Sequence, residues 1–304
     1  MLSKYFKLSV ILLLVLGCGR SSDYEVSSSG RLPASSGAGV VLGSVDPGTN
    51  PNIPYGPLLL SQGQDSITIS RPEYELSWNP STRDINWASW LLSAGDIGHS
   101  GRTQFTEDSE LETYLAPLGQ HAVTPDEYSG SCFDRGHQVP SADRTHDFAE
   151  NTAVFKMSNM IPQTGYLNRG DWEHLEADTR SVLNNEPKTR IWIVAGPIFG
   201  ATKQYMGLHH DIAVPTANFK IVIDLGPDSK AKPSLYAAVI MPNTTSKGTS
   251  PVTDRATLCA DSSHMPASQT VGGWKAYTKS LNEIEKEAGI DLTPVRKLVG
   301  ASAQ

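Results

Sequence analysis

Alternating apolar and polar residues predict a β-hairpin near the start of the folded part of the chain. Residues 74–78 alternate in this way, residues 79–81 form an Asn-Pro-Ser turn signal, and the apolar pattern resumes over residues 85–92. Two such segments joined by a short turn are typical of adjacent antiparallel strands.

Three further apolar runs are short enough to be buried strands. Gly196-Pro197 follows the first run and predicts its end, and Gly226-Pro227-Asp228 opens the loop between the other two. The three runs are residues 190–195, 219–225 and 235–241.

Helical spacing of apolar residues occurs twice. Residues 172–183 predict one helix, and residues 271–288 predict a second helix that is followed by Gly289. Strands and helices are mixed without a strict alternation of strand, helix and strand. The fold class that we predict is therefore α+β, with a central antiparallel sheet flanked by helices.

The N-terminus has the pattern of an export signal. Lys4 and Lys7 precede an apolar stretch at 8–16 that is too short to span a bilayer. The stretch ends in Val-Leu-Gly-Cys, which resembles a bacterial lipobox, so we expect residues 1–17 to be removed and Cys18 to be lipidated. An ordinary signal peptide that happens to contain this cysteine is the alternative. We expect an exported protein, anchored by lipid to a bacterial membrane and facing the periplasm or the exterior; the glycine after the cysteine favours the outer membrane.

Residues 18–56 are rich in Ser, Gly and Pro and lack apolar periodicity, which predicts a flexible tether. The remaining segment, 57–304, is long enough for one folded domain with a full core. With 38% hydrophobic and 19% charged residues, the chain has the composition of a soluble globular protein, which excludes the fibrous and fully disordered classes.

The net charge limits the kinds of partner that the chain can bind. It is −7, and loss of the two lysines of the signal segment takes it to −9. Such a chain has no general attraction for nucleic acid, so an enzyme that acts on nucleic acid would need a local basic cleft. The candidates for that cleft are Arg102, Arg135, Arg144, Lys156, Arg169 and Arg180.

The cysteines suggest one covalent cross-link. If Cys18 is lipidated, Cys132 and Cys259 are the two that remain. Free thiols are uncommon in exported domains, so we expect a disulfide between them. Two free buried thiols are the alternative.

One short stretch gathers the residue types that metal-assisted phosphodiester cleavage requires. It begins with an Asp-Arg-Gly-His motif that ends at His137, and Asn159, Asn168 and Glu176 follow. His137, at the expected end of a strand, is the candidate general base, because a neutral imidazole can deprotonate water near pH 7. A purely structural histidine is the alternative.

Asn168 is the candidate metal ligand, because hard cations such as Mg²⁺ or Mn²⁺ accept amide oxygens and keep most of their waters. Glu176 lies eight residues later, near two helical turns. Both side chains would share a face if one helix covers them, and Glu176 would then hold metal-bound water. The alternatives are a helix N-cap for Asn168 and a solvated helix charge for Glu176.

Three further residues complete the candidate site. Asn159 would orient the histidine or a catalytic water, unless it is a turn residue. Arg135 would bind a phosphate beside the base, unless it pairs with Asp134. Arg102 would stabilise the transition state, unless it is a surface arginine.

The stretch resembles the DNA/RNA non-specific endonuclease family, the ββα-metal nucleases that include secreted bacterial nucleases and the endonuclease G group. The family pattern is Asp-Arg-Gly-His with a following Pro, then Asn-x-x-Pro-Gln, then Leu-Asn, Trp and Leu-Glu. Each part of that pattern is present in this stretch. The likeness extends more loosely over residues 74–298.

The resemblance implies a ββα-metal active site in which His137 is the general base and Asn168 is the direct Mg²⁺ ligand, with Asn159, Glu176 and Arg135 in support. It implies hydrolysis of DNA and RNA with little sequence specificity, and it leaves a homodimer and an inhibitor protein open as partners. A phosphodiesterase with a narrower substrate is one alternative. A surface lipoprotein that uses the fold as a binding module is the other, and the acidic charge favours it.

Overall fold

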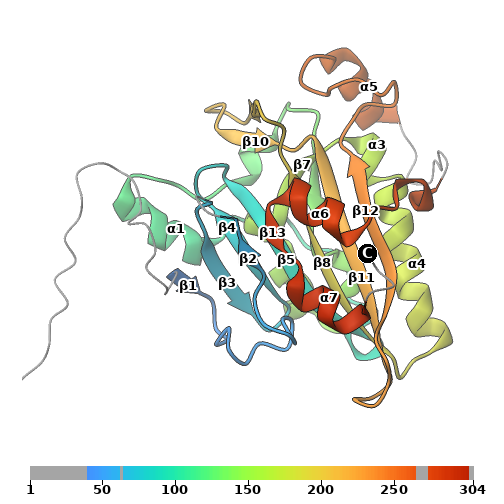
Figure 1. Cartoon of the computed structure of the whole chain (residues 1–304). Helices are drawn as coiled ribbons and strands as arrows, with labels where there is room; N and C mark the ends of the chain where they lie inside the picture. The colour runs from blue at the N-terminus through green and yellow to red at the C-terminus, as the bar shows by residue number, and fades with distance from the viewer. Residues whose placement is uncertain (1–39, 62–63, 265–272, 301–304) are drawn as a thin grey trace, which may run out of the picture. The chain divides into compact units, whose positions relative to one another are not determined.

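A seven-stranded sheet forms the centre of the computed structural model, which describes residues 40–61, 64–264 and 273–300 (Figure 1). Every neighbouring pair of its strands is antiparallel, except that the first two are parallel. In spatial order the strands are β1 (Val40–Leu42), β3 (Ile67–Arg71), β4 (Tyr74–Asn79), β5 (Asp84–Ser93), β8 (Arg190–Ile198), β11 (Ala217–Gly226) and β12 (Ser234–Pro242).

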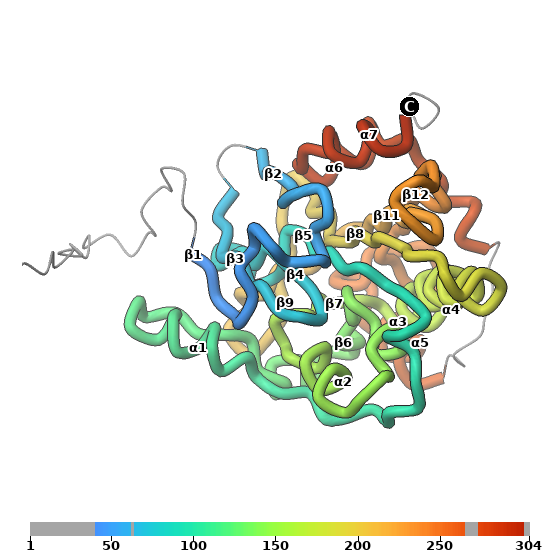
Figure 2. The backbone as a smooth tube through the Cα atoms, turned by 90° about the horizontal axis from the view of Figure 1, so that it is seen from below, coloured from blue at the N-terminus to red at the C-terminus, as the bar shows by residue number. Residues whose placement is uncertain are grey.

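Helices and short strands cover both faces of this sheet, as Figure 2 shows from below. One face carries α6 (Leu281–Ala288) and α7 (Thr293–Val299). The other face carries the antiparallel ribbon of β6 (Asp134–His137) and β7 (Met160–Gln163). It also carries α1 (Ser109–Leu115), α2 (Phe148–Val154), α3 (Gly165–Asn168) and α4 (Asp171–Asn185), and α5 (Arg255–His264) packs beside α3.

Two two-stranded pairings lie outside the sheet and the ribbon. They are β2 (Leu59–Leu60) with β13 (Ile290–Asp291), and β9 (Gln204–Met206) with β10 (Ile212–Val214).

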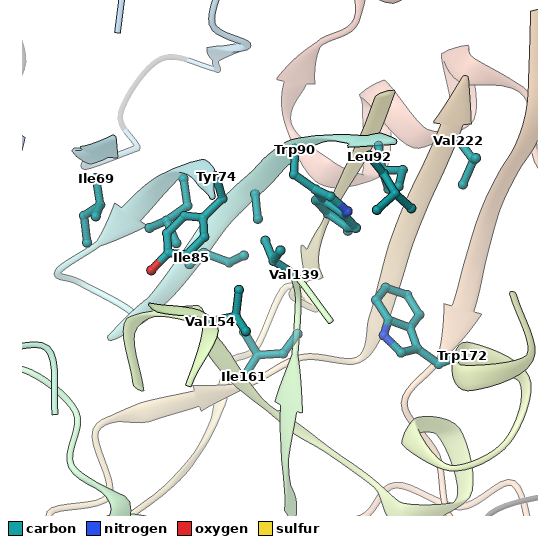
Figure 3. Packing of buried hydrophobic residues seen from close by; sticks show 14 of the residues in the cluster. Ile69, Tyr74, Ile85, Trp90, Leu92, Val139, Val154, Ile161, Trp172 and Val222 are labelled. Carbon is teal, nitrogen blue, oxygen red and sulfur yellow. The ribbon is translucent and has the colours of Figure 1, made fainter. Parts of the chain in front are cut away.

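Burial of both faces explains why the central strands are almost continuously apolar. On β8, Trp192 and Val194 point into the cluster under α6 and α7, whereas Ile191 and Ile193 point into the cluster on the opposite face. Figure 3 shows this second cluster, in which the ring of Trp172 from α4 lies with Trp90, Leu92 and Val222 of the sheet. The predicted α+β class is confirmed.

The predicted hairpin and the strands at 219–225 and 235–241 are confirmed as β4–β5, β11 and β12, and the helix at 172–183 is confirmed as α4. The predicted end of the run at 190–195 is wrong, because β8 continues through Gly196-Pro197 to Ile198. Pairing with β5 stops at Ala195, so the missing N–H of Pro197 costs no hydrogen bond on that side.

The long predicted C-terminal helix is also wrong. Its described part is a short 3₁₀ turn at Trp274–Tyr277 followed by a separate helix, α6. Ser280 starts α6 with a capping box, in which its hydroxyl accepts from the N–H of Glu283 and its own N–H donates to the Glu283 carboxylate. The Ser-x-x-Glu signal was present in the sequence, but the apolar spacing across it obscured the boundary. The helix ends at Gly289 in a left-handed conformation, as predicted.

Part of the segment expected to be a tether belongs to the fold. Residues 40–42 form β1, and Ile53 is buried against the sheet. Asn50 donates to Ser70 Oγ at 2.8 Å, and Asn52 donates to the carbonyl oxygen of Pro72 at 2.8 Å. Hydrogen bonds from polar residues therefore hold this segment in the fold. Because the segment has no apolar periodicity, its sequence predicts a tether instead.

The predicted signal segment, the lipidation site at Cys18 and the rest of the predicted tether lie outside the described residues. Within the described part of the chain, no helix is both long and apolar enough to cross a membrane.

Candidate active site

His137 is the last residue of β6, and the ribbon with β7 fixes its backbone. The ribbon explains the glycine before it. A Cβ on Gly136 would lie 2.1 Å from the Oε1 atom of Gln163 on β7, so a larger residue would have to displace this buried side chain. Packing therefore explains the glycine of the Arg-Gly-His motif, in addition to the chemistry expected of its arginine and histidine.

The imidazole of His137 lies against two aromatic rings. Its centroid is 5.4 Å from that of Phe105 and 4.8 Å, edge to face, from that of Phe155. Burial, together with the positive charge of Arg102, lowers the pKa of His137 to about 3. Nε2 has no hydrogen-bond partner among the described residues. The ring is therefore neutral near pH 7, and its Nε2 atom is buried.

An arginine side chain lies against each of these two aromatic rings. The guanidinium of Arg102 lies 5.1 Å from the centroid of Phe155, and that of Arg135 lies 5.1 Å from the centroid of Phe105. Arg102 is exposed and makes no hydrogen bond to another described residue. Arg135 is partly committed, because Nη2 donates to the carbonyl oxygen of Pro125 at 2.8 Å. The structure thus brings both arginines next to His137, with Arg102 the freer of the two.

Asn168 ends α3 and is held by Asp134, the first residue of β6. Its Nδ2 donates to Asp134 Oδ2 at 2.9 Å. A carboxylate can only accept, so the amide nitrogen must face it, and Oδ1 is left without a donor among the described residues. A free amide oxygen of this kind fits a hard divalent cation. The N-cap alternative for Asn168 is wrong, because Thr164 caps α3.

The interpretation of Asn168 and Glu176 as one face of one helix is wrong. α3 ends at Asn168, α4 begins at Asp171, and Gly170 between them is not helical. Glu176 is not a solvated charge either, since its side chain is only 12% exposed and its Oε1 accepts from Lys220 Nζ at 2.8 Å. Burial raises the pKa of Glu176, and the ammonium of Lys220 opposes that rise.

Asn159, expected to orient the histidine or a catalytic water, is fully buried and binds backbone. Its Oδ1 accepts from the N–H of Val139 at 3.0 Å. Its Nδ2 donates to the carbonyl oxygens of Val139 and Val154 at 3.0 and 2.9 Å. Both amide donors are therefore used, and the side chain fixes the chain two residues beyond His137.

Most residues of the predicted basic cleft are committed to other groups. Arg144 is buried and donates to the carbonyl oxygens of Glu73 and Leu91. The predicted cleft is thereby reduced to Arg102 and part of Arg135. The other three residues face carboxylates: Lys156 faces Asp108, Arg169 faces Asp134 and Arg180 faces Asp143. The alternative pairing of Arg135 with Asp134 is wrong, because Arg169 occupies that carboxylate.

A disulfide joins Cys132 to Cys259 and so links the start of the ribbon to α5. Arg255 of α5 supports the link by donating to the carbonyl oxygens of Gly130 and Ser131 at 2.8 and 3.1 Å. The residues around the base are therefore tied to a helix more than a hundred positions later in the chain.

Sequence reasoning missed two functional contacts. The sequence suggests only Arg135 as a partner for Asp134, whereas the carboxylate binds Asn168 and Arg169. Its position in the Asp-Arg-Gly-His motif was the available signal. Lys220 was absorbed into the apolar run at 219–225. A lysine at an inward-facing position of such a run is itself unusual, and that was the available signal.

A cavity of about 600 Å³ lies apart from the candidate site, since none of the candidate site residues lines it. Its wall includes Arg83, Glu107, Glu127 and Asp211, and Arg83 is already paired with Glu127 and Asp211 at 2.7 and 2.6 Å. The excess of carboxylates would repel a phosphate. An anionic substrate is better matched by the surface beside His137, where Arg102 is exposed.

No group of three or more His, Cys, Asp or Glu side chains arranged to hold a metal was found in residues 40–61, 64–264 and 273–300. A metal at this site would therefore depend on an amide oxygen and water, which is a ligand set suited to Mg²⁺.

Comparison with known proteins agrees with a site that acts on an anionic substrate. The family model described as DNA/RNA non-specific endonuclease matches residues 59–296. A nuclease of Nostoc sp. is 29% identical over 289 residues, covering 93% of this chain and 90% of that protein. A nuclease of Serratia marcescens is 26% identical, covering 61% of this chain and 68% of that protein. The fold is shared with a crystal structure of the EndoG/EndoGI complex, with a TM-score of 0.62 and 19% identity over 82% of this chain and 93% of that chain.

Proposed function

Because the chain belongs to the DNA/RNA non-specific endonuclease family, we propose that it is a Mg²⁺-dependent endonuclease that hydrolyses phosphodiester bonds in both DNA and RNA. The observation that carries this proposal is the neutral imidazole of His137 beside an exposed arginine. A base and a cationic group in one place are what attack of water on a phosphodiester requires.

In this proposal the imidazole of His137 accepts the proton of the attacking water, and Arg102 meets the charge that develops on the phosphate. Asn168 Oδ1 would hold Mg²⁺, with Mn²⁺ as the alternative, and Glu176 would support it through water. When bound, the ion supplies positive charge at the scissile phosphate and the departing 3′-oxygen. The products would be 5′-phosphorylated oligonucleotides.

Asp134 and Asn159 would act by positioning other groups of the site. Asp134 turns the amide of Asn168 so that its oxygen is free, and Asn159 fixes the backbone just beyond His137. Low sequence specificity is expected, because the groups named here address phosphate and not base edges. We propose in addition that residues 1–17 direct export and that Cys18 carries a lipid, with the outer membrane favoured.

The test is cleavage of plasmid DNA and of total RNA by the purified protein, with Mg²⁺ and with EDTA. We expect degradation of both substrates with Mg²⁺ and none with EDTA. EDTA removes the ion, and no side chain named at the site carries as much positive charge. Degradation that persists in EDTA would contradict the metal. If the folded protein cleaves neither substrate and only binds them, the family fold would serve here as a binding module.

A further inference from the structure

Lys220 places an ammonium group inside the core. It lies on β11, where Phe219, Ile221 and Ile223 point toward α6 and α7 and Val222 points the other way. Strand alternation puts Lys220 on the same face as Val222, toward α4. Its side chain is only 2% exposed, which is rare for lysine.

The contacts of this ammonium lead to one residue of the candidate site. Nζ donates to Oε1 of Glu176 at 2.8 Å and lies 3.9 Å from the centroid of the Trp172 ring, within the range of a strong cation–π contact. The ring of Trp90 is 5.9 Å from Nζ, and Figure 3 shows both tryptophans in the apolar cluster on this face of the sheet. Both aromatic rings and the carboxylate therefore hold Nζ in one place.

Packing alone does not explain a charged pair at this position. Taking an ammonium and a carboxylate out of water is unfavourable, and well-packed apolar residues of similar volume often give equal or greater stability. A methionine would fill the space of Lys220 beside Trp90 and Trp172. The pair is better explained by what it does to Glu176.

The two oxygens of Glu176 are in different situations. Oε1 is bound to Lys220, whereas Oε2 receives no hydrogen bond from the described residues, and the side chain keeps 12% of its surface exposed. A carboxylate pinned at one oxygen presents the other in a fixed direction. A free glutamate at the same place would sample several rotamers.

We propose that Lys220 is a positioning residue for phosphodiester cleavage: it fixes Oε1 of Glu176 so that Oε2 is directed at the water of the site. The inference rests on the proposed function. Lys220 touches neither substrate nor metal, so its whole effect passes through Glu176.

A double-mutant cycle tests this dependence. Lys220→Met should lower the rate of plasmid cleavage on the order of 10-fold to 100-fold, the usual effect of losing a residue that supports a site ligand. It should also lower the melting temperature, because Glu176 is left buried without a partner. Glu176→Gln alone should lower the rate at least as much.

The double variant, Lys220→Met with Glu176→Gln, separates function from structure. Removing both charges should restore the melting temperature toward that of the wild type, while the rate stays at the level of Glu176→Gln. Lys220→Arg, which keeps the charge, should retain part of the rate. Lys279→Met is the matched control, since its partner Glu283 is exposed on α6, and it should leave the rate unchanged.

Three results with the double variant would overturn the inference: a rate that recovers with stability, a loss equal to the product of the two single losses, or a protein that stays unstable. A folded Lys220→Met variant at the wild-type rate would overturn it while leaving the nuclease intact. A wild-type protein that fails to cleave in the same assay would instead remove the proposed function, and this inference with it.

Discussion

At the scale of single residues, the neighbours of each polar side chain decide its role. His137 is kept neutral by two aromatic rings and by Arg102, and Asn168 is turned by Asp134. Both residues could be identified from the sequence, because they belong to a dense motif. Their orientation could not, since it depends on contacts between segments that are far apart in the chain.

Glu75 provides a residue-scale prediction about stability. Its carboxylate is fully buried, and burial raises its pKa to about 7, although Ser70 and Asn50 both donate to it. A carboxyl whose pKa is raised in the folded state binds its proton more tightly there than in the unfolded chain. Its contribution is therefore most favourable below about pH 4.5, the unfolded value, and is lost as the pH rises through 7.

Glu75→Gln should therefore stabilise the protein at pH 8.5 relative to the wild type and have a smaller effect at pH 5. Thermal unfolding midpoints at the two pH values measure this difference. Glu283→Gln, at an exposed helix start, is the matched control. An equal shift of the Glu75→Gln midpoint at both pH values would show that Glu75 does not titrate in this range.

At the scale of elements, the sequence predicted strands better than boundaries. Strands β4, β5, β8, β11 and β12 have apolar runs, because both faces of the sheet are buried, and these runs predict their positions. Strands β1 and β3 of the same sheet are not predicted. The end of β8 and the start of α6 were missed, because one depends on which neighbour is paired at Pro197 and the other on a capping box at Ser280. Pairing partners and caps are set by three-dimensional context more than by periodicity.

The cross-link of α5 to the β6 ribbon supplies the element-scale prediction. The disulfide between Cys132 and Cys259 closes a separation of 127 residues. Reduction, or the Cys259→Ser change, should lower the free energy of unfolding by about 2–4 kcal/mol, because the unfolded chain gains freedom. Denaturant titration with and without dithiothreitol measures this. The Cys132→Ser/Cys259→Ser double variant is the control, and dithiothreitol should not change its midpoint.

At the scale of the whole molecule, an acidic chain is expected to act on an acidic polymer. With a net charge of −7, the chain as a whole does not attract nucleic acid, and the structure leaves few free cationic groups near His137. In the proposed function, local geometry supplies the attraction through Arg102 and the proposed Mg²⁺ ion. The fold class followed from the mixture of strands and helices, whereas the domain start did not, because Asn50 and Asn52 fix residues that carry no apolar signal.

The central claim is that His137 is the base of a nuclease. The most direct measurement is the single-turnover rate of plasmid cleavage with Mg²⁺ for the wild type, His137→Ala and His121→Ala, whose side chain is 68% exposed on the wall of the acidic cavity. We predict that His137→Ala lowers the rate by about 10²-fold to 10⁴-fold with the fold intact, and that His121→Ala leaves it unchanged. A folded His137→Ala variant that cleaves at the wild-type rate would contradict the account.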